Sequence, residues 1–353
     1  MGAFYNGGMY VHLRLHTEFS VVDGTTRIDE VVKAAAADGQ PALAITDLNN
    51  LFGAIKFYKE GRGKGVKPLL GAEIYLETEG GSDPSRMLVL VQNKQGYLNL
   101  SELLARAWTK NVVKNLAVCT WAWLQELSEG LVALSGAQAG PVGQALLKGD
   151  ETRAASLALK LAGIFPHRFY MELQRAGRAD DESHVAAAVQ LAARLQLPVV
   201  ATHPIQFLTA DDYEAHEARV CIAGGEILAN PRRVRRFTRE QYFKSAQQMQ
   251  ELFADVPSAL ANTVEIAKRC SLTLVLGKPQ LPAFPTPNGM PAEEYFRFAS
   301  FEGLEERLKH LYPDEARRDK ERPRYVERLE FELGTILKMG FPGYFLIVGD
   351  FIQ

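Results

Sequence analysis

The 353-residue sequence has few cysteines, no long hydrophobic run and no excess of charge of either sign. Its three cysteines, Cys119, Cys221 and Cys270, lie far apart and match no metal or disulfide spacing, so we expect reduced thiols and a cytoplasmic location. No apolar run approaches the roughly 20 residues of a membrane helix, so no membrane partner is expected. The opening eight residues lack the pattern of a signal peptide. A net charge of −2 gives no general attraction for polyanions, so nucleic-acid contact would need a local patch.

Short apolar segments alternate with amphipathic segments over the first two hundred residues. The segments that favour strands are 10–15, 42–46, 67–76, 87–92, 131–135, 168–173 and 198–202. The helical patterns between them are 28–38, 51–61, 97–110, 141–148, 152–164 and 182–195. Such alternation predicts a largely parallel sheet with helical crossovers. Seven strands over this length favour a distorted (β/α) barrel over a small open sheet.

The character of the sequence changes after Thr202. Residues 211–223 and 246–269 favour helices, and 277–291 holds five prolines and two glycines, as in a linker. Beyond it, 292–311 and 315–339 are charged and amphipathic, and the last residues form an apolar helix start without a polar tail. We therefore expect a possible N-terminal extension (1–8), a barrel domain (9–276), a linker (277–291) and the truncated, mainly helical start of a second domain (292–353).

Polar side chains gather where the predicted strands of the barrel lie. Because sites in parallel α/β folds form at the carboxyl ends of strands, we expect these side chains to share a cleft. The candidates are the polar residues His12, Arg14, His16, Asp23, Asp47, Glu73, Arg86, Glu172, His203 and Gln206, together with the apolar Leu48 and Pro204 next to Asp47 and His203 in sequence. Imidazole and carboxylate groups suit Zn²⁺ or Mn²⁺, but a guanidinium has no free lone pair for a metal. Only His16, Asp23 and Glu73 are plausible ligands. The alternative for the first predicted strand, residues 10–15, is that it is half-buried and that its polar face is simply hydrated.

Several motifs in order carry a resemblance to a known family. They are residues 12–17 (HLRLHT) with Ser20 and Asp23-Gly24, 42–47 (ALAITD), 71–73 (GAE), 96–100 (GYLNL), 197–202 (LPVVAT), 251–253 (ELF) and 340–348 (GFPGYFLIV). Through them the chain resembles the amino-terminal part of the alpha subunits of bacterial DNA polymerase III, where a PHP domain precedes the start of the palm. The resemblance implies a distorted seven-stranded barrel.

The resemblance also implies a set of metal ligands that this chain has largely lost. It keeps His16, Asp23 and Glu73, while other residues stand where the family has its remaining ligands: Arg14, Leu48, Arg86, Pro204 and Gln206. We therefore expect no tightly held metal and neither hydrolase nor proofreading activity. Our hypothesis is that Arg14 and Arg86 replace the cations and neutralise the remaining carboxylates. The alternatives are two unrelated surface arginines, or an active Zn²⁺- or Mn²⁺-dependent phosphoesterase or 3′–5′ exonuclease with a reduced ligand set.

The resemblance places the polymerase active site, with its Mg²⁺, beyond Gln353, so we expect no primer extension by this chain. It implies a proofreading exonuclease (epsilon) subunit as a partner of the PHP domain, with DNA and other replicase subunits bound through regions beyond the chain. A plain interaction module outside DNA synthesis is a further alternative. A basic run, Arg232, Arg233, Arg235 and Arg236, predicts a nucleic-acid or acidic-partner patch. The alternative there is a solvated loop balanced by Glu226 and Glu240.

Overall fold

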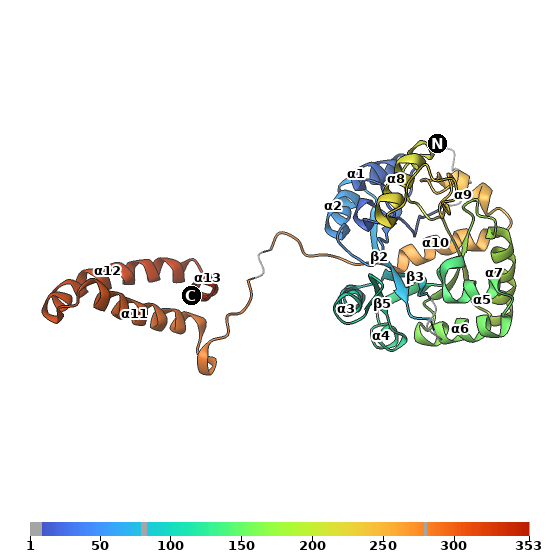
Figure 1. Ribbon diagram of the computed structural model, residues 1–353. Helices are drawn as coiled ribbons and strands as arrows, with labels where there is room; N and C mark the ends of the chain where they lie inside the picture. The colour runs from blue at the N-terminus through green and yellow to red at the C-terminus, as the bar shows by residue number, and fades with distance from the viewer. Residues whose placement is uncertain (1–8, 79–82, 279–280, 353) are drawn as a thin grey trace, which may run out of the picture. The chain divides into compact units, whose positions relative to one another are not determined.

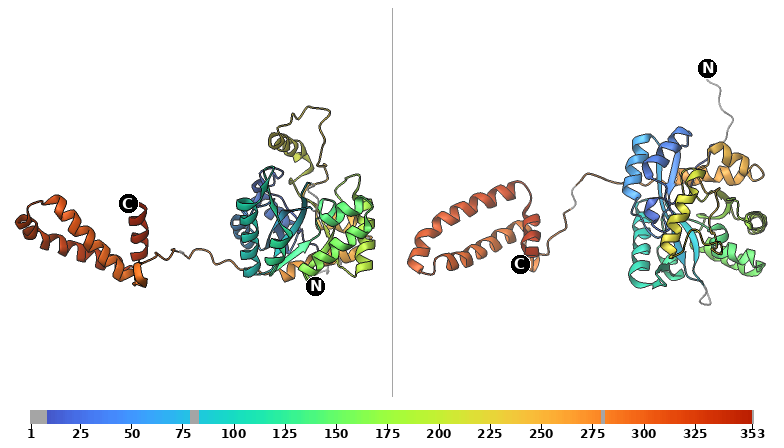
Figure 2. Two further views of the ribbon diagram at one scale, coloured as in Figure 1. Left: turned by 60° about the horizontal axis from the view of Figure 1, so that its bottom comes forward. Right: turned by 45° about the horizontal axis from the view of Figure 1, so that its top comes forward.

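A computed structural model of the chain describes residues 9–78, 83–278 and 281–352. The predicted extension over residues 1–8 lies outside the described residues. The chain forms two compact units that divide between Thr273 and Leu274 (Figures 1 and 2). Each unit has its own hydrophobic core.

The first unit is a barrel built on a sheet of eight strands among the described residues. The strands are β1 (Ala42–Ile45), β2 (Lys67–Leu76), β3 (Ser85–Val91), β4 (Val112–Val113), β5 (Leu116–Cys119), β6 (Leu131–Leu134), β7 (Phe169–Gln174) and β8 (Val199–Thr202). Their order is β4-β5-β2-β3-β6-β7-β8, and β1 also pairs with β2. The β6–β7, β7–β8 and β1–β2 pairs are parallel, whereas β3 runs antiparallel to both β2 and β6. The short β2–β3 connection explains this, because a parallel neighbour would need a long crossover.

The segment predicted as the first strand, residues 10–15, is not a regular strand. It makes single parallel bridges, His12 to Leu43 and Leu15 to Ile205. Two of its backbone N–H groups bond instead to side-chain hydroxyls, Val11 to Thr263 and Leu15 to Thr46. Through these bridges, residues 10–15 connect β1 to the residues that follow β8, and this connection closes the ring of strands. The distorted seven-stranded barrel is confirmed, with β4 and β5 as a hairpin outside the ring that the sequence did not reveal.

Helices surround the barrel (Figure 1). They are α1 (Ile28–Ala37), α2 (Ala54–Lys64), α3 (Lys94–Lys110), α4 (Trp121–Glu126), α5 (Pro141–Leu147), α6 (Glu151–Ile164), α7 (Asp181–Leu195), α8 (Tyr213–Gly224), α9 (Ala246–Leu252) and α10 (Pro257–Arg269). Short 3₁₀ turns are η1 (Glu18–Ser20), η2 (Ala137–Ala139), η3 (Ala210–Asp212) and η4 (Pro287–Gly289). The single helix predicted over 246–269 is wrong. Pro257 starts a new helix at its first position, and the residue before a proline is pushed out of helical conformation.

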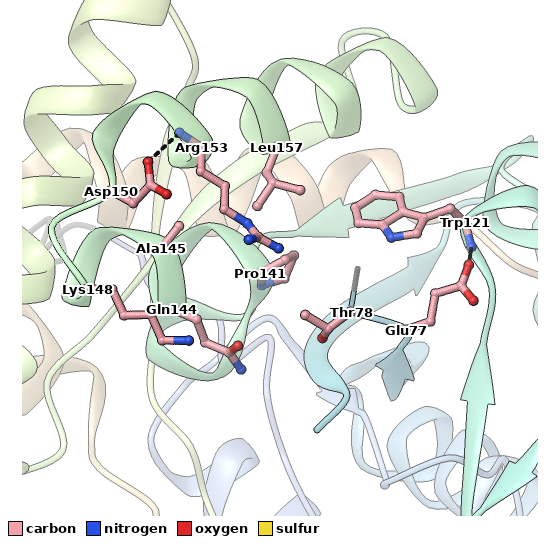
Figure 3. Close-up of a pocket in the computed structure, with 10 residues that line it drawn as sticks. All are labelled: Glu77, Thr78, Trp121, Pro141, Gln144, Ala145, Lys148, Asp150, Arg153 and Leu157. Carbon is pink, nitrogen blue, oxygen red and sulfur yellow. Dashed lines mark hydrogen bonds between the residues drawn. The ribbon is translucent and has the colours of Figure 1, made fainter. Parts of the chain in front are cut away.

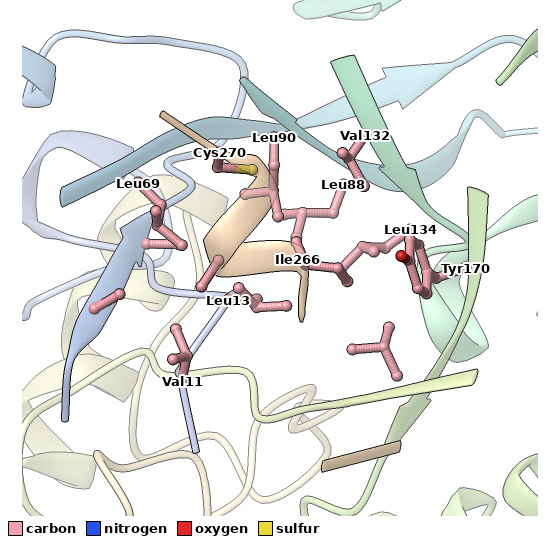
Figure 4. Close-up of a cluster of buried hydrophobic side chains, with 14 residues drawn as sticks. Val11, Leu13, Leu69, Leu88, Leu90, Val132, Leu134, Tyr170, Ile266 and Cys270 are labelled. Carbon is pink, nitrogen blue, oxygen red and sulfur yellow. The ribbon is translucent and has the colours of Figure 1, made fainter. Parts of the chain in front are cut away.

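The core of the barrel joins its first segment to its last helix. Val11 and Leu13 share one cluster of buried side chains with Leu88 and Leu134 from β3 and β6, and with Ile266 from α10 (Figure 4). All five side chains are fully buried. The helix α10 is therefore an integral part of the barrel, although it follows β8 by more than fifty residues.

The second unit contains α11 (Ala292–Leu311), α12 (Glu315–Lys338) and α13 (Pro342–Ile352), packed around Phe296, Leu333 and Leu346. Within the described residues, no single helix is long and apolar enough to span a membrane, and α12 with α13 meet that criterion only as a pair bent by 118°.

Candidate functional site: a cleft of paired arginines and carboxylates

The centre of the candidate site is the buried guanidinium of Arg14. Its Nε and Nη2 donate to the two carboxylate oxygens of Glu172 at 2.9 and 3.2 Å, and its Nη1 donates to Glu73 Oε1. Arg14 comes from the segment that closes the ring, Glu73 from β2 and Glu172 from β7. One planar cation thus joins three parts of the barrel, with the two-pronged geometry that makes arginine–carboxylate pairs strong.

A second chain of charges leads from Glu73 to the rim of the cleft. His16 Nδ1 lies 2.9 Å from Asp23 Oδ1, and its Nε2 lies 3.1 Å from Glu73 Oε2 at an angle that makes no hydrogen bond. Arg86 Nη1 is 3.3 Å from both Asp23 Oδ2 and Glu73 Oε2. Its Nη2 donates to Tyr75 Oη at 2.9 Å. Arg14 and Arg86 both point at carboxylates of the cleft rather than to solvent.

These contacts decide the charge states of the cleft. Burial disfavours ionisation of His16, but Asp23 and Glu73 outweigh burial and raise the pKa of His16 to about 10. Burial opposes the charge of Glu73 too, yet Arg14 and Arg86 hold its pKa well below its usual range. In Asp23 the effect of burial is overcome by His16 and Arg86, and its pKa is lowered. The cleft is therefore a network of fixed opposite charges at neutral pH.

Glu172 is fully buried, and all of its acceptor capacity is used. Besides Arg14, it accepts hydrogen bonds from the Gly136 backbone N–H at 3.0 Å, from Gln174 Nε2 at 3.0 Å and from the Thr202 hydroxyl. Gly136 follows β6 with a φ of +84°, a left-handed conformation that glycine adopts without cost. A Cβ atom there would lie 1.9 Å from the carbonyl oxygen of Arg86.

Replacing Gly136 by alanine is expected to lower the free energy of unfolding by roughly 3 kcal/mol, since it combines backbone strain with a steric clash. The matched control is Gly149→Ala, where φ is +73° but a Cβ meets nothing within 4 Å. That control is expected to cost only about 1 kcal/mol. Urea denaturation of both variants provides the comparison, and equal losses would contradict the proposed close approach at Gly136.

Asp47 belongs to a different network from the one predicted for it. Among the described residues no arginine pairs with it. Its carboxylate accepts hydrogen bonds from the Thr17 backbone N–H at 2.6 Å, from the Thr17 hydroxyl and from the Ser20 hydroxyl at 2.8 Å. Burial raises the pKa of Asp47 in spite of these donors. Asp47 thus fixes the loop that carries Asp23 and is already satisfied without a cation.

The sequence placed two further residues, His12 and His203, in the cleft, and the structure does not bring them there. His12 Nε2 bonds to the Lys244 carbonyl and His203 Nε2 to the Glu240 carbonyl, each at 2.7 Å. Burial lowers the pKa of His12 to about 4 and that of His203 to about 3, so both rings are neutral packing groups. Leu48, in contrast, lies beside the cleft: it forms a parallel bridge with Glu73, and it belongs to a small apolar cluster with Tyr75 and Val118.

A cavity of about 290 Å³ opens above Arg14, Glu73 and Arg86. Its lining includes the predicted Pro204 and Gln206, Arg236 of the predicted basic run, and residues not predicted for the cleft: Gly136, Gln138, Ala139, Gln174, Arg178 and Phe237. Arg178 donates to Gln174 Oε1 at 3.1 Å, and burial lowers its pKa. Its position just after β7 was the available sequence signal, because cleft residues follow strand ends.

The predicted basic run divides into residues with different roles. Arg236 lines the cavity, and Arg233 forms an enclosed ion pair with Glu217 of α8. Arg232 and Arg235 are exposed. The balancing acids proposed from the sequence, Glu226 and Glu240, are not the partners of these arginines among the described residues, and Glu240 pairs with Lys244 instead.

Another cavity of about 290 Å³ lies between the end of β2, the start of α4 and the helices α5 and α6 (Figure 3). Arg153 and Lys148 reach it from one side, and Glu77 and Trp121 reach it from the other. None of the predicted site residues lines it. The charged network around Arg14 is therefore the candidate functional site.

The fold is a mixed β/α barrel, and histidine, aspartate and glutamate side chains gather at one cleft. Residues 12–176 match the PHP domain family. The barrel is a PHP domain. Residues 294–353 match the family described as the bacterial DNA polymerase III alpha NTPase domain. The DNA polymerase III subunit alpha of Pseudomonas aeruginosa is 51% identical over 346 residues, which is 98% of this chain and 30% of that protein. That of Escherichia coli K12 is 48% identical over 345 residues, again 98% and 30%.

The chain therefore belongs to the family of bacterial DNA polymerase III alpha subunits, and it spans about 30% of the length of these relatives. Among solved structures, an amidohydrolase from Chromobacterium violaceum is 14% identical with a TM-score of 0.42, covering 60% of this chain and 96% of that one. That likeness is too distant to support an inference.

The residues of the cleft do not fit the metal cluster that the PHP resemblance implies. Among residues 9–78, 83–278 and 281–352, no group of three or more His, Cys, Asp or Glu side chains is arranged to hold a metal ion. The oxygens of Glu73 and Asp23 are engaged by Arg14, Arg86 and His16. A divalent cation would have to displace fixed positive charges that cannot be deprotonated.

Proposed function

We propose that this chain contributes a PHP domain without a working metal centre, which braces a replicative DNA polymerase and docks its partners. The observation that carries the proposal is the position of Arg14 between Glu73 and Glu172, where it neutralises carboxylates that would otherwise need a cation. The membership of the DNA polymerase III alpha family supports a role in DNA replication. We further propose that the polymerase chemistry belongs to the part of these relatives that this chain does not match.

A metal analysis tests the absence of a metal centre. After exposure to Zn²⁺ or Mn²⁺ and gel filtration, the purified chain is expected to retain less than one ion per molecule. It is also expected to show no chelator-sensitive cleavage of p-nitrophenyl phosphate or of a single-stranded oligonucleotide. Two or three ions per molecule, with phosphate-ester cleavage that stops on chelation, would support the alternative of an active phosphoesterase or exonuclease.

For the docking role, we propose the proofreading exonuclease subunit of the same replicase as a partner. The support is the family membership together with the well-packed core of the barrel. Calorimetric titration of the chain with that exonuclease subunit tests the role directly. A complex with one exonuclease per chain is expected, and the lack of any complex would contradict the docking role.

A further inference from the structure

The end of α8 and the loop that follows it carry an exposed apolar surface in an otherwise ordinary barrel. Ile222, Ile227 and Val234 expose 83, 73 and 75% of their surface, and Leu228 exposes 40%. The four residues lie within thirteen positions of the sequence. In the left view of Figure 2, this segment stands away from the barrel. We call Ile222, Ile227, Leu228 and Val234, with the exposed Arg232 and Arg235, the α8 patch.

The α8 patch is held in shape from within. The Glu226 N–H bonds to the Cys221 carbonyl at 2.9 Å, and the Asn230 N–H bonds to the Ile227 carbonyl at 3.0 Å. The enclosed ion pair between Arg233 and Glu217 of α8 then ties the loop back to the helix at the residue before Val234. Apolar side chains presented on a turn of fixed shape lose less entropy on binding than those of a flexible loop.

The helix below the patch is itself anchored to the barrel. Arg219 Nε donates to the Val21 carbonyl at 2.7 Å, and His216 Nε2 lies 2.8 Å from the Asp23 carbonyl. Binding at the patch would therefore act on a rigid support rather than on a free arm.

The charge of the segment indicates the chemistry of the partner. Residues 222–239 contain five arginines and a single glutamate. Arg233 is neutralised by Glu217, Arg239 lies 3.7 Å from Glu214, and Arg236 faces the cleft. In the described part of the chain, Arg232 and Arg235 have no carboxylate partner and lie on either side of Val234 in sequence.

Two arginines without a carboxylate partner among the described residues, in the same segment as four exposed apolar side chains, favour a protein over a nucleic acid as the ligand. The affinity of a protein for a phosphate backbone rises with each cation that neutralises a phosphate. Apolar side chains add nothing to this electrostatic contribution. A protein interface, in contrast, combines a buried apolar centre with a charged rim. An exposed apolar patch of this kind is typical of an interaction site.

We infer that the α8 patch docks an acidic protein segment whose apolar side chains cover Ile222, Ile227, Leu228 and Val234, while its carboxylates meet Arg232 and Arg235. This inference rests on the proposed docking function and assigns that function to a surface. The patch is separate from the charged network around Arg14, since none of its six residues lines the cavity above it.

Fluorescence polarisation with synthetic probes tests the chemistry of the patch. The probe is a short labelled peptide that alternates glutamate with leucine and phenylalanine. The double variants Ile222→Asp/Val234→Asp and Arg232→Glu/Arg235→Glu are each expected to weaken its binding by more than about tenfold. The matched controls are Leu159→Asp, an exposed apolar residue of α6, and Lys33→Glu/Lys59→Glu, two exposed cations of α1 and α2. Both controls are expected to bind the probe as the wild type does.

Three further results would overturn the inference: unchanged binding by both patch variants, equal binding of a peptide with lysine at every glutamate, or binding of a labelled dT oligonucleotide in place of the acidic peptide. Titration with the exonuclease subunit separates this inference from the proposed function. If the exonuclease binds the wild type and both patch variants equally, the patch assignment fails while the docking role stands. If the exonuclease binds neither the wild type nor the patch variants, the docking role fails. The peptide measurements then test the α8 patch on their own.

Discussion

Replacing Arg14 by leucine is expected to lower the free energy of unfolding by about 3–5 kcal/mol, the range found when one partner of a buried ion pair is removed. The reason is that Glu172 is fully buried and would lose the guanidinium with which it pairs. Glu73 would still have Arg86 and His16 beside it. Most of the lost stability would therefore come from the unpaired carboxylate of Glu172. Chemical denaturation at pH 7, with thermal unfolding as a second readout, measures the effect.

The companion variant is Arg14→Leu/Glu172→Gln, which removes both charges. It is expected to recover a large part of the stability, because a neutral amide keeps hydrogen bonds without the cost of an unpaired buried charge. Arg106→Leu is the surface control, since its partners Glu102 and Glu126 are largely exposed and such pairs contribute little. Equal stability of Arg14→Leu and the wild type would show that Arg14 is not the centre of the cleft.

Raising the pH from 7 to above 10 is expected to destabilise the wild-type barrel more than its His16→Gln variant, by on the order of 3 kcal/mol. The pKa of His16 is about 10 in the folded chain and about 6.5 in an unfolded one. A group whose folded pKa is raised stabilises the fold fully below its unfolded pKa, and this contribution disappears as the pH passes the folded pKa. The loss should therefore fall between about pH 6.5 and 10.

Urea denaturation of both proteins at a series of pH values gives the measurement. The difference between the two curves removes the titration of lysines, tyrosines and cysteines, which both proteins share. Glutamine can still donate to Asp23 but carries no titratable proton, so its curve should be flatter over the same range. Parallel curves would show that His16 is not protonated in the folded state at neutral pH.

Much of the fold and part of the site could be predicted from periodicity. Short apolar segments between amphipathic ones located six of the strands, and the apolar–polar alternation of residues 10–15 brought Arg14 and His16 into the cleft with Glu73 and Asp23. The same alternation placed His12 there as well. That error has a tertiary cause: the ring of His12 packs against Phe243, with ring centres 4.9 Å apart, and bonds to a carbonyl 232 residues away. Local periodicity carries no information about such distant partners.

Other features depended on contacts that a single sequence does not specify. Residues 10–15 alternate as a strand does, but hydroxyl groups of Thr46 and Thr263 take the hydrogen bonds that a sheet ladder would use. The short β4–β5 hairpin is too brief to produce a periodic signal. Arg178 follows the predicted strand over 168–173, but its place after a strand does not by itself show which side chains of that loop line the cavity.

The union of Val11 and Leu13 with Ile266 in one core has a consequence for synthesis on the ribosome. About 250 residues separate these partners, and at 5–20 residues per second roughly 13–50 s pass between their emergence. Throughout that interval the nascent first segment cannot complete its packing and remains open to chaperones and to aggregation. A translational pause ahead of the codon for Ile266 would lengthen this exposure, so the yield of native protein should depend on elongation speed over that stretch of message.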